Sequence, residues 1–89
     1  MDRQTATQHL ESFLEENPDL KPDEIYRISQ PSEMNIEGDT FYSFHWVEAE
    51  NGQSARGGWN YYVFSDGQVL CGGGLTSPEE IYQDWKTIN

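Results

Sequence analysis

Apolar side chains recur at helical spacing in the first part of the chain. Four of them occupy positions i, i+4, i+7 and i+8 and form one stripe along a helix: Ala6, Leu10, Phe13 and Leu14. We predict a helix over residues 2–16, with Asp2 as its candidate cap. Asn17 and Pro18 end it, because the residue before a proline avoids the helical region of backbone conformation.

The same spacing returns near the other end of the sequence. Ser77 begins a capping box, in which Pro78 takes the first helical position and Glu80 stands three residues after the cap. The buried stripe expected for this second helix lies at i, i+4 and i+7: Ile81, Trp85 and Ile88. We predict a helix over residues 78–87.

Between the helices, the apolar residues follow the two-residue period of strands. Residues 40–49 predict a strand, and the heavier of its two faces is expected to point to the core: Tyr42, Phe44, Trp46 and Glu48. Residues 25–29 are dominated by β-branched and aromatic side chains and predict a short strand, with a helical turn begun at residues 21–24 as the alternative. Residues 30–39 and 50–58 contain turn-forming residues, so we predict loops there.

A hairpin is predicted over residues 59–71, where two apolar runs flank Asp66 and Gly67. Asp-Gly suits a tight turn because glycine adopts positive φ without a Cβ clash. With a two-residue turn, Val63 opposes Leu70. A turn with a bulge would instead shift this register and turn one strand's side chains to the other face.

The order of the elements is helix, four strands and helix, which predicts an α+β fold in a single domain over residues 1–89. Short hairpin-type connections imply an antiparallel sheet of about four strands, in one layer covered by the helices. Two arrangements of the helices are open. If they cover opposite faces of the sheet, no large apolar face is exposed. If both cover one face, the other is left for a partner.

Acidic residues greatly outnumber basic ones. The 16 acids and 5 bases give a formal net charge of −11, of which residues 1–50, with 12 acids and 3 bases, hold −9. Such a chain repels phosphate backbones, so direct nucleic-acid binding is not expected, whereas a basic protein would be attracted. The first 20 residues are unlike a signal peptide, and no run approaches the about 20 apolar residues of a membrane span. We expect a cytoplasmic location without membrane insertion.

Candidate catalytic and ligand-binding motifs are weak. The glycines at residues 72–74 precede a helix, but no lysine follows and two glutamates would repel a phosphate. Cys71 and His45 are a conceivable nucleophile and base, yet no third group or oxyanion element is evident. His9 and His45 lie far apart in sequence, and residues 17–24 lack the glycine of a calcium loop. We therefore expect no catalysis, no metal and no cofactor.

Aromatic residues are the main functional signal, because they make up 13% of the chain and gather on the predicted strands. Tyr and Trp suit protein interfaces, since they combine apolar area with a hydrogen-bonding tip. We expect a non-catalytic interaction protein, of inhibitor or immunity type, that binds a basic partner or forms a homodimer. The alternative is a small-ligand domain with a pocket between sheet and helices lined by these rings. The candidate binding residues are five: Trp46, Trp59, Tyr61, Tyr62 and Phe64.

Overall fold

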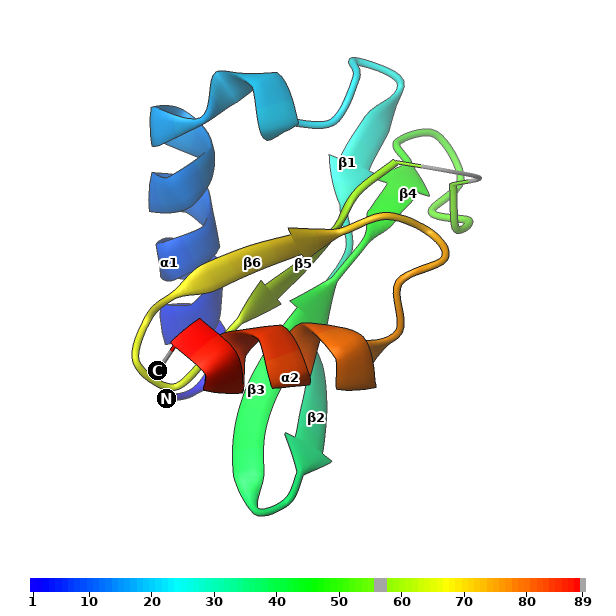
Figure 1. Ribbon diagram of the computed structural model, residues 1–89. Coiled ribbons are helices and arrows are strands. Elements are labelled where there is room, and N and C mark those ends of the chain that lie inside the picture. The colour runs from blue at the N-terminus through cyan, green and yellow to red at the C-terminus, as the bar shows by residue number, and fades with distance from the viewer. Residues whose placement is uncertain (56–57, 89) are drawn as a thin grey trace.

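The computed structural model describes residues 1–55 and 58–88 and has an α+β fold (Figure 1). Its two helices lie near the two ends of the chain, and a 3₁₀ helix follows the first. All strand pairing is antiparallel. The elements in chain order are α1 (Arg3–Glu16), η1 (Pro18–Leu20), β1 (Tyr26–Ile28), β2 (Ser32–Ile36), β3 (Asp39–Phe44), β4 (Trp46–Glu48), β5 (Asn60–Val63), β6 (Val69–Gly72) and α2 (Pro78–Ile88).

The described strands form two sheets rather than one. The main sheet has the order β2-β3-β5-β6, and β1 pairs with β4 in a separate two-stranded sheet. The strand predicted over residues 40–49 is broken at His45, where the chain passes from the main sheet into the small one. The backbone N–H of His45 donates to Ser29 Oγ at 3.0 Å, so the break is held by a contact to the end of β1.

The prediction of a loop over residues 30–39 is wrong, because this segment contains β2. β2 pairs with β3 from Ser32↔Ser43 to Ile36↔Asp39. The turn between them is Glu37-Gly38, with φ of 50° and 85°, and positive φ at both central residues is typical of a type I′ hairpin turn. Polar residues concealed this strand, since it lies at the sheet edge and mainly Met34 and Ile36 pack inward.

The hairpin of β5 and β6 exists, but the predicted two-residue turn at Asp66 and Gly67 is wrong. Val63 pairs with Val69 rather than opposing Leu70, so the connection is longer. The N–H of Gly67 donates to the carbonyl of Phe64 at 2.8 Å, and Gly67 has φ of 85°. The register is therefore shifted by one residue, as in the bulged alternative, and the side chains of β6 point to the faces opposite to those of the two-residue turn.

The two helices cover opposite faces of the main sheet, which was the first of the two open arrangements (Figure 1). Consecutive strand residues point to opposite faces, so each face has its own core cluster. The α1-side cluster consists of Ala6, Leu10, Leu14, Tyr42, Phe44, Tyr61 and Val63. The α2-side cluster consists of Phe41, Tyr62, Phe64, Ile81, Tyr82 and Trp85.

Local signals located both helices correctly. The Asp2 side chain accepts a hydrogen bond from Thr5 N at 2.8 Å, and Ser77 Oγ accepts one from Glu80 N at 3.2 Å. The buried stripe expected for α2 needs one correction. Tyr82 is buried beside Trp85, whereas Ile88 is 60% exposed because α2 continues past its buried residues. None of the described helices is long and apolar enough to cross a membrane.

Candidate interaction site

The five candidate aromatic residues divide into core and surface. Tyr61, Tyr62 and Phe64 are buried in the two core clusters. Trp46 is partly buried against the α1-side cluster, and Trp59 precedes β5 with 39% of its surface exposed. Direct contact with a partner is therefore open to Trp59 and to part of Trp46, while the other three rings build the scaffold beneath them.

Trp46 joins the small sheet to the main one. Its Nε1 donates to the Tyr61 hydroxyl at 2.8 Å, and that hydroxyl donates in turn to the carbonyl of Leu20 in η1. Desolvation raises the pKa of Tyr61, which keeps this phenol neutral and able to donate. The Tyr26 ring lies against Trp46 with 5.4 Å between centroids. The chain of contacts holds β1, β4 and η1 in place around the main sheet.

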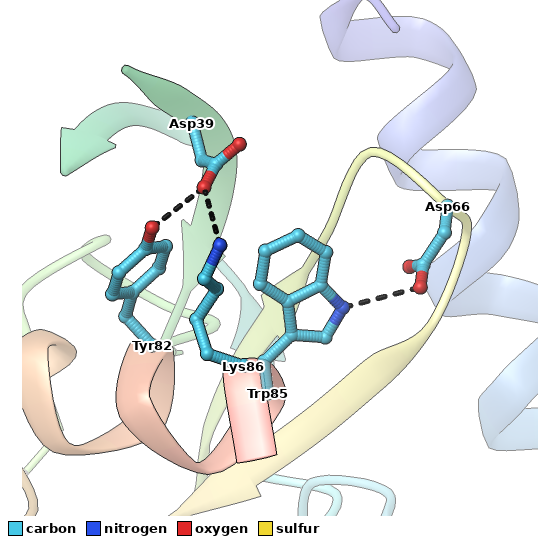
Figure 2. A network of polar contacts seen from close by, with 5 residues as sticks. All are labelled: Asp39, Asp66, Tyr82, Trp85 and Lys86. Atoms are coloured by element: carbon cyan, nitrogen blue, oxygen red, sulfur yellow. Dashed lines mark hydrogen bonds and ion pairs between the residues drawn. The ribbon is translucent and has the colours of Figure 1, made fainter. Parts of the chain in front are cut away.

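On the opposite face, polar side chains fasten α2 to the sheet (Figure 2). The Tyr82 hydroxyl donates to Asp39 Oδ2 at 2.6 Å, and Lys86 Nζ lies 3.7 Å from the same oxygen. Trp85 Nε1 donates to Asp66 Oδ2 at 3.2 Å, across the loop between β5 and β6. These groups are engaged within the fold, so this network is structural.

The rings between α2 and the sheet are stacked on one another. Phe64 lies between two neighbours, with centroid distances of 4.7 Å to Phe41 and 4.6 Å to Trp85. The Phe64 and Trp85 rings are nearly parallel, at 8°. Offset stacking at this distance adds to the free energy of ring burial. Ring contacts therefore occupy the space around Phe64 between the sheet and α2.

A surface groove of about 470 Å³ lies between α1 and β1. Its apolar residues come from three segments: Leu14 in α1, Pro22 in the connector after η1, and Tyr26 and Ile28 in β1. Its charged residues are four acids and two bases: Glu11, Glu15, Asp23, Glu24, Lys21 and Arg27. The groove thus combines an apolar lining with a net charge of −2.

The carboxylates of this groove are available to a partner. Among residues 1–55 and 58–88, the structure contains one ion pair, between Lys86 and Asp39. This pair lies outside the groove. All four acids of the groove are exposed. Glu11 and Glu15 stand at i and i+4, which places them on one side of α1. Carboxylates without ion-pair partners attract cationic side chains, and the apolar surface between them can pack against the aliphatic stems of those side chains.

The sequence did not predict this groove, because residues 17–24 were considered as a calcium loop and that interpretation was rejected. Residues 21–24 line the groove together with Glu11 and Glu15. The available signal was the helical spacing of these two glutamates beside the buried Leu14. Nothing in the local pattern indicated that the connector and β1 would stand across from them.

The candidate catalytic residues are in separate settings. His45 Nε2 lies 3.4 Å from Ser54 Oγ. Cys71 is half-buried on β6, and burial raises the pKa of its thiol to about 11, which disfavours the nucleophilic thiolate. In the part of the chain that the structure describes, no group of three or more His, Cys, Asp or Glu side chains is placed to hold a metal ion.

Comparison with known protein families, with curated proteins and with solved structures finds no match to this chain. The groove and the surface around it are therefore the features from which we infer a function.

Proposed function

We propose that the protein is a non-catalytic interaction module, of inhibitor or immunity type, that docks on a basic protein partner. The observation behind this proposal is the groove between α1 and β1, where four exposed carboxylates without ion-pair partners surround apolar side chains. Acidic groups of this kind steer a basic partner and raise the rate of association. The apolar lining supplies contact area that is removed from water on binding.

Two exposed apolar residues outside the groove lining add candidate contact area. Ile25, which directly precedes β1, is 68% exposed, and Trp59 is 39% exposed. Interfaces concentrate binding energy in a few large side chains surrounded by polar ones, and tryptophan is enriched among them. In this proposal Trp59 and Trp46 act as the aromatic anchors, while Tyr61, Tyr62 and Phe64 contribute by holding the sheet. The partner is met in the cytoplasm, where a chain with a single free cysteine is stable as a thiol.

The acidic balance favours a basic partner over a second copy of the chain. Each copy carries −11, so a dimer formed through the groove would bring like charges together. A small-ligand pocket between sheet and helices was the other candidate function. Phe64 is stacked between Phe41 and Trp85, which weighs against a cavity at that position. Interaction through the outer surface is therefore the function that we propose.

Affinity capture from the native cell extract, followed by titration with the captured protein, tests this function. We expect a basic partner whose affinity falls at least about tenfold when salt rises from about 0.05 M to about 0.5 M. At the same salt concentration, the double variant Glu15→Lys/Glu24→Lys should bind the partner about tenfold more weakly than the unmodified protein. The matched control Glu50→Lys/Asp84→Lys makes the same change in net charge at exposed positions outside the groove. Binding that is insensitive to salt, or equally weakened by both variants, would show the proposal to be wrong.

A further inference from the structure

One edge of β1 has no strand beside it in the described chain, since β1 pairs with β4 alone. Two bonds fix which peptide groups face β4: Ala49 N donates to Ile25 O at 3.0 Å, and Ser29 N donates to His45 O at 2.7 Å. In an antiparallel pair, the residues that bond to the neighbour alternate with residues that point away. The peptide groups of Tyr26 and Ile28 therefore point away from β4.

Little of this outer edge is satisfied within the fold. Tyr26 N donates to the carbonyl of Asp23 at 2.9 Å, which uses one of its groups. The carbonyl of Tyr26 and both peptide groups of Ile28 have no strand partner among residues 1–55 and 58–88. Unpaired edge groups of this kind are a template for another strand.

The free edge opens into the groove. Tyr26, Arg27 and Ile28 line one side of the groove, Glu11, Leu14 and Glu15 of α1 line the other, and no residue of β4 takes part. Figure 1 shows the same order, with β1 between β4 and α1. The groove thus combines three things that a peptide segment needs: backbone groups, apolar contacts and charge.

We propose that this groove binds an extended cationic segment of the partner, which adds to β1 as a third strand of the small sheet. This inference rests on the proposed function and specifies how the basic partner is held. Main-chain hydrogen bonds to Tyr26 and Ile28 supply affinity, as in other cases of strand addition. Lys or Arg side chains of the segment meet Glu11 and Glu15 across the groove, and an apolar side chain packs on the half-buried Tyr26 and Ile28.

The positive charge of Arg27 in β1 does not prevent a cationic segment from binding in the groove. Arg27 points to the face of the small sheet opposite Tyr26 and Ile28, because side chains alternate along a strand. Its Nη2 lies 3.3 Å from where a Cβ on Gly52 would stand, and Gly52 belongs to the turn after β4. Arg27 lines the groove, but the end of its guanidinium reaches that turn.

Synthetic peptides test strand addition directly. The probe is a capped peptide of about eight residues in which lysine and valine alternate. It is titrated into the full chain labelled with ¹⁵N. We expect backbone amide shifts at Tyr26 and Ile28, and tryptophan fluorescence should respond through Trp46, which contacts Tyr26. A second peptide of the same sequence has all of its backbone nitrogens methylated. It keeps the charges but lacks strand donors, and it should bind at least about tenfold more weakly. A third peptide with glutamate for lysine should not bind.

Variants of the protein complete the test. Glu15→Lys should weaken binding of the lysine peptide at least about fivefold. Asp84→Lys, an equal charge change on the exposed side of α2, should leave binding within about twofold. Equal binding of the methylated peptide, amide shifts away from β1, or no binding of the lysine peptide would each overturn strand addition. The proposed function would survive those results if the captured partner still bound in a salt-dependent way that Glu15→Lys/Glu24→Lys weakens.

Discussion

The hydroxyl of Tyr82 in α2 donates a hydrogen bond to the carboxylate of Asp39 at 2.6 Å, which connects the last helix to the first residue of β3 (Figure 2). The two residues are 43 positions apart in sequence. Lys86 Nζ, 3.7 Å from the same carboxylate, reinforces the contact from the next turn of α2. A charged acceptor makes this hydrogen bond stronger than one between neutral groups.

Because of this contact, the free energy of unfolding should decrease at alkaline pH. The hydrogen bond to Asp39, with burial as the second cause, raises the pKa of Tyr82 from 10.0 to about 12. Since the folded-state pKa lies above the unfolded value, the stabilisation is complete below about pH 10 and is lost as pH rises through about 12. We expect Tyr82→Phe to lose less stability than the wild type across this window, as measured by urea unfolding at a series of pH values. Asp39→Asn should bring the pKa of Tyr82 back toward its ordinary value, and equal losses in the wild type and Tyr82→Phe would contradict the assignment.

Phe64 should be needed for stability and Trp59 should not. Phe64→Ala leaves a cavity between Phe41 and Trp85, and we expect the free energy of unfolding to fall by about 3–5 kcal/mol. Trp59→Ala removes a side chain that is 39% exposed and should change the free energy by less than about 1 kcal/mol. Chemical denaturation of both variants measures the difference. A loss of binding in Trp59→Ala at unchanged stability would then report on contact with the partner.

Gly58 should tolerate no side chain. Its φ is +82°, and a Cβ there would stand 2.5 Å from two ring atoms of Trp46. Gly58→Ala therefore combines an unfavourable backbone conformation with a displaced indole, and we expect a loss of about 1–3 kcal/mol in the free energy of unfolding. Gly73→Ala is the matched control, because no atom lies within 4 Å of a Cβ at that position, and it should change stability by less than about 1 kcal/mol. Similar losses in both variants would contradict the predicted clash.

Cys71 should react slowly in the folded protein. With a pKa of about 11, only about one thiol in a thousand is ionised at about pH 8, against about a quarter for an ordinary cysteine. We expect alkylation by iodoacetamide to be at least about 100-fold slower than in denaturant, with a rate that still rises above about pH 9. Mass spectrometry at timed intervals measures both rates. Rapid reaction of the folded chain at about pH 8 would show that the thiol is less buried than the structure places it.

Short-range patterns predicted much of the fold. The spacing of Ala6, Leu10 and Leu14 located α1, and the Ser77 cap located the start of α2. These signals are reliable because a helix depends on residues within about four positions of each other. The antiparallel α+β class followed in the same way from short connections between strands. β2 was missed because an edge strand with one solvated face has few apolar residues to reveal it.

The candidate binding residues show the limit of such reasoning. Trp46, Tyr61 and Tyr62 lie on strands as predicted, whereas Trp59 and Phe64 flank β5. Tyr61, Tyr62 and Phe64 lie in the core. Aromatic residues on both faces of a strand are compatible with two arrangements. Either a helix covers each face, or a helix covers one face and a partner protein covers the other. The choice depends on where α1 and α2 pack, and that is determined by contacts between residues far apart in the chain.

By itself, the sequence determined where both helices lie, the antiparallel class and the acidic surplus, because local spacing, caps and charge depend on residue type and near neighbours. Tertiary structure alone decided three other features: the register of β6, the opposite placement of the helices, and the groove between α1 and β1. A one-residue shift in a turn reverses every side chain of a strand, and a groove exists only where separate segments meet. Those outcomes depend on which distant surfaces bury one another, and no local pattern contains that information.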